Sequence, residues 1–99
     1  MLIISKFIDD NSSPITGLVP TIKIYNLSTD VVAVNNLAMT EVSAASEPGW
    51  YKYEFSTVNS SYTYTIDIDG GSSLDESFRY QDGIISSGTA QIPVVDFGS

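Results

Sequence analysis

The acidic residues between positions 67 and 75 are the side chains of this sequence that come closest to a metal-binding pattern. Asp67 and Asp69 in "DIDGG" carry the hard oxygen ligands that calcium prefers, and Asp75 follows shortly after the two glycines. An EF-hand loop beginning at Asp67 would require an acidic or Asn side chain, a Gly and a Glu at its fifth, sixth and twelfth positions. Those positions hold Gly71, Ser72 and Phe78. The pattern fails, so we expect no metal, and Asp67, Asp69 and Asp75 are only weak candidates for a loop site.

Side chains for acid–base and nucleophilic catalysis are scarce. The chain contains neither His nor Cys, so it lacks the commonest general base, the commonest metal ligand and the thiol nucleophile. Paired carboxylates could hydrolyse a glycoside only in a cleft that raises the pKa of one of them, and a sandwich of 99 residues with short loops has little room for such a cleft. "DGGSS" follows an expected strand, but no helix opens after it, so it does not fit a phosphate-binding loop. We expect a protein that is not an enzyme and that binds no cofactor.

The charge balance is acidic and disfavours polyanionic partners. Four Lys and Arg residues stand against twelve Asp and Glu residues, for a formal net charge of −8. This charge repels phosphate backbones and anionic lipid head groups, so we expect neither nucleic acid nor a membrane as a partner. The first residues lack the basic region and the long apolar stretch of a signal peptide, and the chain has no Cys. Both features favour assembly in a reducing cytoplasm.

Short β-branched and aromatic runs, bounded by turn-forming residues, recur at intervals of about 8 to 12 residues. Strands are predicted at residues 2–8, 18–26, 31–35, 51–55, 62–69, 78–80 and 84–85, with turns at 27–30 and 81–83. Residues 35–42 form either a short strand or an irregular crossover. No window shows the 3.6-residue period of a helix. The pattern predicts an all-β chain that forms a single immunoglobulin-like or transthyretin-like β-sandwich of about seven short strands, with residues 1–99 as one domain.

Two of these predicted strands carry most of the aromatic side chains. Their alternating residues are predicted to form the buried inner face of one sheet: Tyr51, Tyr53, Phe55, Tyr62, Tyr64, Ile66 and Ile68. Trp50, Tyr51 and Tyr62 lie near strand ends, where each either contacts a partner or covers the core. Arg79 lies between two aromatic residues. We expect it to pair with Asp67, Asp69 or Glu76, or with an acidic group of another subunit.

Both ends of the chain are apolar and are separated from the centre by polar turns. Residues 1–8 and 88–99 are therefore either extended arms or strands that close the chain's own sandwich. A short apolar arm can add to the sheet edge of a neighbour through main-chain hydrogen bonds. In that case the C-terminal contacts with a partner would come from Ile92, Val94, Val95 and Phe97.

Four short motifs follow one another in a characteristic order. They are a Pro-Thr-x-x-Ile strand (Pro20, Thr21 and Ile24), a Met-x-Glu segment (Met39 and Glu41), a Gly-x-Tyr-x-Tyr strand (Gly49, Tyr51 and Tyr53) and an Asp-Gly-Gly turn (Asp69, Gly70 and Gly71). Through these motifs residues 17–80 resemble small β-sandwich proteins encoded among the structural genes of tailed bacteriophages. The segment "SAASEP" before Gly49 departs from the tight turn of that pattern, which leaves the role of this loop open.

The resemblance implies a non-enzymatic structural subunit of a bacteriophage particle. Such a subunit would be a capsid decoration protein or a head or tail accessory protein, made in the host bacterial cytoplasm and located in the virion. Its implied partners are other virion proteins and further copies of the chain in a homo-oligomer. An alternative prediction is a module that recognises a host surface protein or glycan through Trp50 and the tyrosines near the strand ends. A bacterial adhesin is disfavoured because the chain shows no signal peptide.

Overall fold

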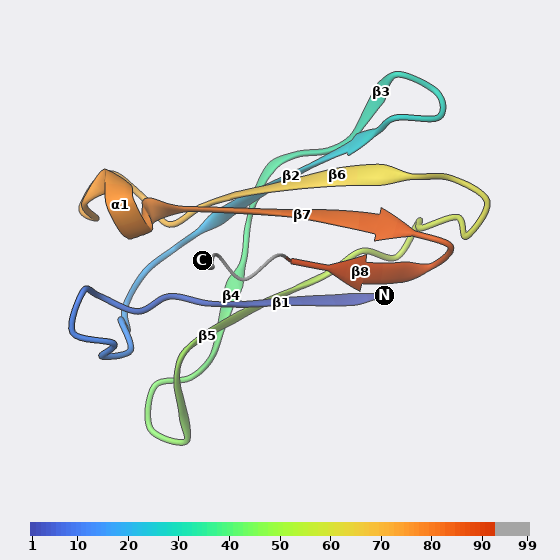
Figure 1. Ribbon diagram of the computed structural model, residues 1–99. Coiled ribbons are helices and arrows are strands. Elements are labelled where there is room, and N and C mark those ends of the chain that lie inside the picture. Colours follow the sequence, from blue (N-terminus) through green and yellow to red (C-terminus); the bar gives the residue numbers. More distant parts are fainter. Residues whose placement is uncertain (93–99) are drawn as a thin grey trace.

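Strands with alternately buried side chains form two antiparallel sheets that pack face to face (Figure 1). The computed structural model describes residues 1–92. One sheet has three strands in the order β1 (Leu2–Lys6), β5 (Glu47–Glu54) and β4 (Thr40–Ser43). The other has five, in the order β3 (Val31–Ala38), β2 (Thr21–Asn26), β6 (Tyr64–Asp69), β7 (Tyr80–Ser86) and β8 (Thr89–Gln91). The predicted all-β sandwich is confirmed, with eight strands in the described part of the chain.

The core lies between the two sheets and follows the period of two that their strands share. In β2 the side chains of Ile22 and Ile24 are fully buried, and Ile66 and Ile68 of β6 face the same way. These residues meet a second set from the three-stranded sheet and its flanks, which comprises Ile3, Phe7, Tyr51 and Phe55. Each large apolar side chain that is buried in this way contributes about 1.5 to 3 kcal/mol to folding.

The aromatic residues that were predicted to share one sheet in fact come from both. Tyr51 and Phe55 belong to β5 and its end, whereas Tyr64 lies in β6 of the other sheet. The rings of Phe55 and Tyr64 meet edge to face at 5.2 Å between centroids. The prediction that these side chains form the inner face of one sheet was therefore wrong. The connection from residue 55 to residue 63 crosses between the sheets and does not form a hairpin. Tyr53 and Tyr62 are only half-buried.

The segment predicted as a strand at residues 78–80 is instead a short helix followed by a strand. Helix α1 (Glu76–Arg79) begins after Asp75, whose carboxylate accepts a hydrogen bond from the Ser77 N–H at 3.0 Å. An aspartate at this capping position satisfies a free backbone donor of the first turn, which favours a helix at this point. Strand β7 starts directly after it, at Tyr80.

The predicted turn at residues 81–83 lies inside β7. Asp82 pairs with Asp67 of β6, and Gly83 pairs with Ile66. A Cβ atom on Gly83 would lie 2.6 Å from the Gln91 carbonyl oxygen and 3.0 Å from the Ile92 Cα atom. The glycine therefore permits a close approach of the chain that leaves β8, and it does not form a turn.

Other local predictions agree with the structure. Pro20 directly precedes β2, where its missing N–H costs no ladder hydrogen bond, and its carbonyl accepts from the Met39 N–H at 2.7 Å. Residues 27–30 form the predicted turn, and Gly71 has the positive φ of +112° that the Asp-Gly-Gly turn permits. The first strand is shorter than predicted and ends at Lys6, after which Ile8 forms an isolated bridge with Pro14.

No helix within residues 1–92 is long and apolar enough to cross a membrane.

Candidate functional site

The side of the three-stranded sheet that faces away from the core is a mixed apolar and basic surface, here called the outer face. Alternation places the even-numbered residues of its three strands there: Leu2, Ile4, Lys6, Thr40, Val42, Pro48, Trp50, Lys52 and Glu54. Leu2 is 55% exposed and Ile4 47%. The outer face also carries two of the four basic side chains of the whole sequence, Lys6 and Lys52.

Trp50 and Lys6 form the most specific contact on this outer face. They are directly opposite each other in the register of β5 and β1. The Lys6 ammonium lies 5.5 Å from the centre of the Trp50 ring, within the range of a cation–π interaction. At the other end of the same strand pair, the α-amino group of Met1 pairs with the Glu54 carboxylate at 2.7 Å. These contacts hold the charged groups in place on an otherwise apolar strand pair.

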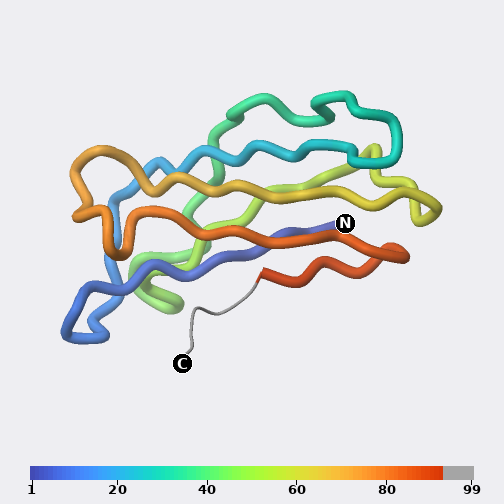
Figure 2. Tube along the Cα trace, turned by 45° about the horizontal axis from the view of Figure 1, so that its top comes forward, coloured from blue at the N-terminus to red at the C-terminus, as the bar shows by residue number. Residues whose placement is uncertain are grey.

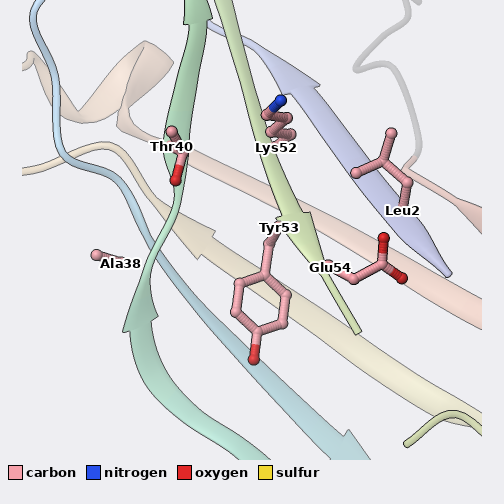
Figure 3. A pocket seen from close by; sticks show the side chains of 6 residues that line it. All are labelled: Leu2, Ala38, Thr40, Lys52, Tyr53 and Glu54. Carbon is pink, nitrogen blue, oxygen red and sulfur yellow. The ribbon is translucent and has the colours of Figure 1, made fainter. Parts of the chain in front are cut away.

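A shallow hollow of about 430 Å³ lies at one end of the outer face (Figure 3). It is lined by Leu2, Ala38, Thr40, Lys52, Tyr53 and Glu54. In Figure 3 the Tyr53 ring points away from Lys52 and Glu54, as the alternation of β5 requires. This hollow therefore offers a phenol ring and a few polar groups, and it contains no pair of acidic groups that could carry out acid–base chemistry.

Among residues 1–92, strand β1 lies at the edge of its sheet, and the hydrogen-bond pattern shows which main-chain groups point to that edge. Met1 and Phe55 exchange main-chain hydrogen bonds, and the Phe7 N–H donates to the Gly49 carbonyl. Because hydrogen-bonded pairs alternate in an antiparallel ladder, the odd-numbered residues of β1 bond to β5. The N–H and C=O groups of Leu2, Ile4 and Lys6 therefore point to the other edge, where no strand of residues 1–92 pairs with them.

A larger groove, here called the edge groove, runs along this edge and has a volume of about 890 Å³. One side is β1 with Trp50, and the other is formed by α1, β7 and the chain at β8. Its lining is largely apolar and includes Leu2, Ile4, Ile8, Trp50, Phe78, Tyr80, Ala90 and Ile92. In Figures 1 and 2, β1 and β8 lie on the same side of the molecule.

Gln81 of β7 closes the bottom of the edge groove by joining the two sheets. Its amide nitrogen donates to the carbonyl oxygen of Lys6, one of the β1 main-chain groups that point to this edge. Its amide oxygen accepts a hydrogen bond from the Ser5 hydroxyl. A single side chain therefore satisfies a buried hydroxyl and one main-chain acceptor, which fixes the spacing between β1 and β7.

The acidic residues of β6 and the following turn are separated by their own partners. Asp67 lies opposite Asp82 on β7 and Lys23 on β2. The pKa of the Asp67 carboxyl is raised, chiefly by its partial burial and secondly by its hydrogen bond to Asp82. Asp69 accepts two hydrogen bonds from Arg79, at 2.7 and 3.1 Å, and the pKa of Asp69 is lowered chiefly by this partner.

Asp75 is likewise engaged, since the N–H and hydroxyl groups of Ser77 both donate to its carboxylate. The weak metal candidates Asp67, Asp69 and Asp75 are not brought together. Within residues 1–92 no three acidic side chains are grouped closely enough to hold a metal ion. Of its three expected partners in the same chain, Arg79 forms its ion pair with Asp69.

The residues predicted to contact a partner fall into four groups. Trp50 and Ile92 both line the edge groove. Tyr51 is fully buried, so its prediction as a contact residue was wrong. Tyr62 packs against Tyr64, and Arg79 is ion-paired with Asp69 at 2.7 Å; neither residue lines the groove. Val94, Val95 and Phe97 lie outside the described residues.

Tyr51 is buried because its hydroxyl group organises the loop between β1 and β2. The hydroxyl donates to the Ile15 carbonyl at 2.8 Å and accepts from the Leu18 N–H at 3.1 Å. Gly49, two residues earlier, has φ +86°, and a Cβ there would lie 2.8 Å from the Cβ of Pro14. Gly49 and Tyr51 of the Gly-x-Tyr motif therefore pack this loop against β5.

Sequence analysis did not find Ile4, Lys6 or Gln81 as residues of the site. A usable signal for Ile4 was present, because Leu2, Ile3 and Ile4 are consecutive apolar residues and a strand turns alternate side chains to opposite faces. In a two-layer sandwich, where one face of each sheet meets the core, this pattern predicts apolar side chains on the outward face of β1 as well. Gln81 gave no comparable signal, because its partners Ser5 and Lys6 lie more than 70 residues away.

Comparisons with protein-family models, curated proteins and solved structures found no match for this chain. The outer face and the edge groove together offer exposed apolar side chains, two lysines and main-chain groups that no strand of residues 1–92 pairs with. Such a combination is suited to non-covalent binding of another polypeptide.

Proposed function

We propose that the protein is a non-enzymatic structural subunit of a bacteriophage particle, a capsid decoration protein or a head or tail accessory protein. The particle assignment is supported by the resemblance carried by the four motifs between Pro20 and Gly71. In this proposal the chain docks on other virion proteins, in many copies, through the outer face of its three-stranded sheet.

The observation that carries the docking surface is the contrast in charge between the two outer faces of the sandwich. The three-stranded sheet exposes Leu2, Ile4 and Val42 beside two lysines. The corresponding side of the five-stranded sheet also exposes apolar side chains, such as Val32 and Ile84, but its central strands carry a cross-strand row of charged side chains with two carboxylates, formed by Lys23, Asp67 and Asp82. Exposed apolar groups beside charges of the sign that is rare in an acidic chain favour contact with an acidic or neutral protein surface.

The particle assignment is tested by mass spectrometry of purified virions of the phage that encodes this chain. The protein should be present in stoichiometric amounts with the capsid or tail proteins. Its absence from intact, infectious particles would refute the proposal.

The docking surface is tested by a matched pair of variants in the same phage. Val42→Lys places a charge on the outer face, and Ile84→Lys does so on the other sheet, at side chains exposed to similar extents of 38% and 42%. We expect Val42→Lys to reduce the copies per particle at least tenfold and Ile84→Lys to leave them unchanged. Equal incorporation of both folded variants would exclude this face as the docking surface.

The second candidate function is recognition of a host surface glycan, because the half-buried Trp50 ring lines the edge groove. Sugar rings stack on exposed aromatic faces, but here the Lys6 ammonium already lies over this ring. Binding on a glycan array that is lost in Trp50→Ala, and retained in Tyr62→Ala, would favour this function over docking in the particle.

A further inference from the structure

Positive charge gathers on the outer face of the three-stranded sheet although the chain as a whole is acidic. Lys6 and Lys52 are two of the four basic residues in a sequence of net charge −8, and both side chains are exposed. On the same face the Glu54 carboxylate is paired with the α-amino group of Met1 at 2.7 Å. The outer face is therefore a positive region of a negative molecule, and it attracts anionic groups that the rest of the surface repels.

The strand register sets the spacing of the two lysines. Lys52 of β5 lies directly opposite Ile4 of β1, and Lys6 lies opposite Trp50. The lysines are therefore diagonal neighbours on adjacent strands, which places them about 7 to 8 Å apart. The side chain of Ile4, which is 47% exposed, lies beside both of them. A complementary surface needs two negative groups at about this spacing, together with an apolar group that packs on Ile4.

The hollow at one end of the outer face has room for one of these negative groups (Figure 3). Lys52 lines the hollow together with Thr40, which lies directly opposite it on β4. An ammonium group and a hydroxyl group on neighbouring strands can both donate hydrogen bonds to one carboxylate. Leu2 and Ala38 add apolar surface to the lining, which suits the methylene groups of a glutamate side chain.

We propose that the outer face binds an acidic, extended segment of a neighbouring protein whose two carboxylates pair with Lys6 and Lys52. The carboxylate at Lys52 also accepts a hydrogen bond from Thr40, and apolar side chains of the segment pack on Leu2 and Ile4. In an extended strand, residues i and i+2 share a face and lie about 6.6 to 6.8 Å apart, close to the spacing of the lysines. This inference rests on the proposed docking function and names the chemistry of the docked partner.

A protein is favoured over a nucleic acid or an acidic polysaccharide because the lysines lie among exposed aliphatic side chains. Leu2, Ile4 and Val42 share the outer face with them. Phosphate and sugar groups offer such side chains little apolar surface, and two lysines supply few of the contacts that hold a polyanion. An acidic protein segment complements the charges and the aliphatic groups together.

Trp50 reports binding at this face without a label. It is the only tryptophan of the sequence, and the Lys6 ammonium lies 5.5 Å from the centre of its ring. A carboxylate that pairs with this ammonium changes the surroundings of the ring, so binding should change the Trp50 fluorescence. The probe is a synthetic peptide, Leu-Thr-Glu-Thr-Glu-Thr-Leu, which in extended form carries both Glu and both Leu on one face. The same peptide with Gln in place of both Glu is its matched control.

The full-length protein is titrated to millimolar peptide and followed by fluorescence and by amide NMR. Resonances of Lys6, Trp50 and Lys52 should shift, and those of Lys23 and Asp67 on the other sheet should not. The Glu peptide should bind about fivefold more tightly than the Gln peptide, as expected for exposed ion pairs. Salt at roughly 0.5 M should abolish this difference, because the Debye length falls to a few ångströms. Lys52→Gln should weaken binding of the Glu peptide about threefold. Lys23→Gln, which removes the same charge from the other sheet, should leave it unchanged.

Equal binding of the two peptides, no binding of either, or shifts centred on the other sheet would overturn the inference. Shifts that grow with protein concentration alone would assign the outer face to a second copy and would overturn it as well. Because this experiment uses the isolated protein, none of these outcomes bears on the particle assignment.

A second arm in the phage separates the chemistry of the partner from the docking surface itself. Lys6→Gln combined with Lys52→Gln should lower the copies per particle, as Val42→Lys does. The double variant keeps the contact between the sheets, because Gln81 binds the main-chain carbonyl of Lys6 and not its side chain. Normal incorporation of the double variant, with Val42→Lys excluded, would leave the docking surface in place and rule out an acidic partner.

Discussion

The amide nitrogen of Gln81 on β7 donates to the main-chain carbonyl of Lys6 on β1, and through this bond the two sheets are joined beside the edge groove. The amide oxygen of the same side chain accepts from Ser5, which is 3% exposed. The sandwich is thus closed on this side by one polar side chain that reaches from the five-stranded to the three-stranded sheet.

Replacing Gln81 should destabilise the fold by more than its exposure would indicate. Gln81→Ala leaves the buried Ser5 hydroxyl without its acceptor, so we expect the free energy of unfolding to fall by about 1 to 3 kcal/mol in urea denaturation. Gln91→Ala, at an exposed site on β8, is the matched control and should change it by less than about 0.5 kcal/mol. The double variant Ser5→Ala, Gln81→Ala should lose little more unfolding free energy than Gln81→Ala alone, because both substitutions remove the hydrogen bond between Ser5 and Gln81. Fully additive effects would show that this bond does not join the sheets.

Tyr51 should act on the loop between β1 and β2. Tyr51→Phe keeps the ring in the core but leaves the Ile15 carbonyl and the Leu18 N–H without their partner. We expect a loss of about 1 to 3 kcal/mol in the free energy of unfolding. Tyr53→Phe, in the same strand and half-buried, should have little effect. A Tyr51→Phe variant as stable as the parent would contradict the assigned hydrogen bonds.

Asp67 should lower stability at neutral pH. Its pKa is raised in the folded state, first by burial and then by Asp82, so folded protein binds this proton more tightly than unfolded protein. Stability is therefore lost as the pH rises from the ordinary aspartate range through the raised pKa. Asp67→Asn should increase the free energy of unfolding at pH 7 by about 0.2 to 1 kcal/mol, since like charges that face each other across strands repel. Below about pH 3 the gain should vanish, and a gain independent of pH would exclude this cause.

Asp69, two residues further along the same strand, should behave in the opposite way. Its pKa is lowered by Arg79, so its contribution to stability is present above the ordinary aspartate pKa and is lost as the pH falls. Asp69→Asn should reduce the free energy of unfolding at pH 7 by up to about 1 kcal/mol, the usual range for a partly exposed ion pair. Chemical denaturation at pH 7 and at pH 2.5 checks both variants. If both aspartates shifted stability in the same direction at pH 7, the assigned pairing would be wrong.

Gly83 should tolerate no side chain. Gly83→Ala would bring a Cβ to 2.6 Å from the Gln91 carbonyl oxygen and to 3.0 Å from the Ile92 Cα. Since both contacts are with main chain that cannot rotate away, we expect a loss of about 1 to 3 kcal/mol, measured by thermal or urea unfolding. A neutral result would show that the chain after β8 does not approach β7 at this point.

The sequence predicted the sheets well where the period of two was unbroken. Strands β2 and β6 were found because Ile22, Ile24, Ile66 and Ile68 alternate with polar residues along them. It failed at residues 78–79, which were predicted as strand although Asp75 caps a helical turn. It failed again at residues 81–83, where Gly83 suggested a turn but lies inside β7. A capping side chain offers the backbone a local hydrogen bond that competes with extended structure.

Alternation, composition and turn residues by themselves determined that this chain forms a β-sandwich, with Asp67 on a strand face and Pro20 at a strand start. These are local properties, set by neighbours along the chain. Only the tertiary structure decided that β5 and β6 belong to different sheets, that Arg79 binds Asp69, and that β1, an edge strand among residues 1–92, is joined to the other sheet by Gln81. Strand order and cross-sheet contacts join residues far apart in sequence, so no short stretch of residues encodes them.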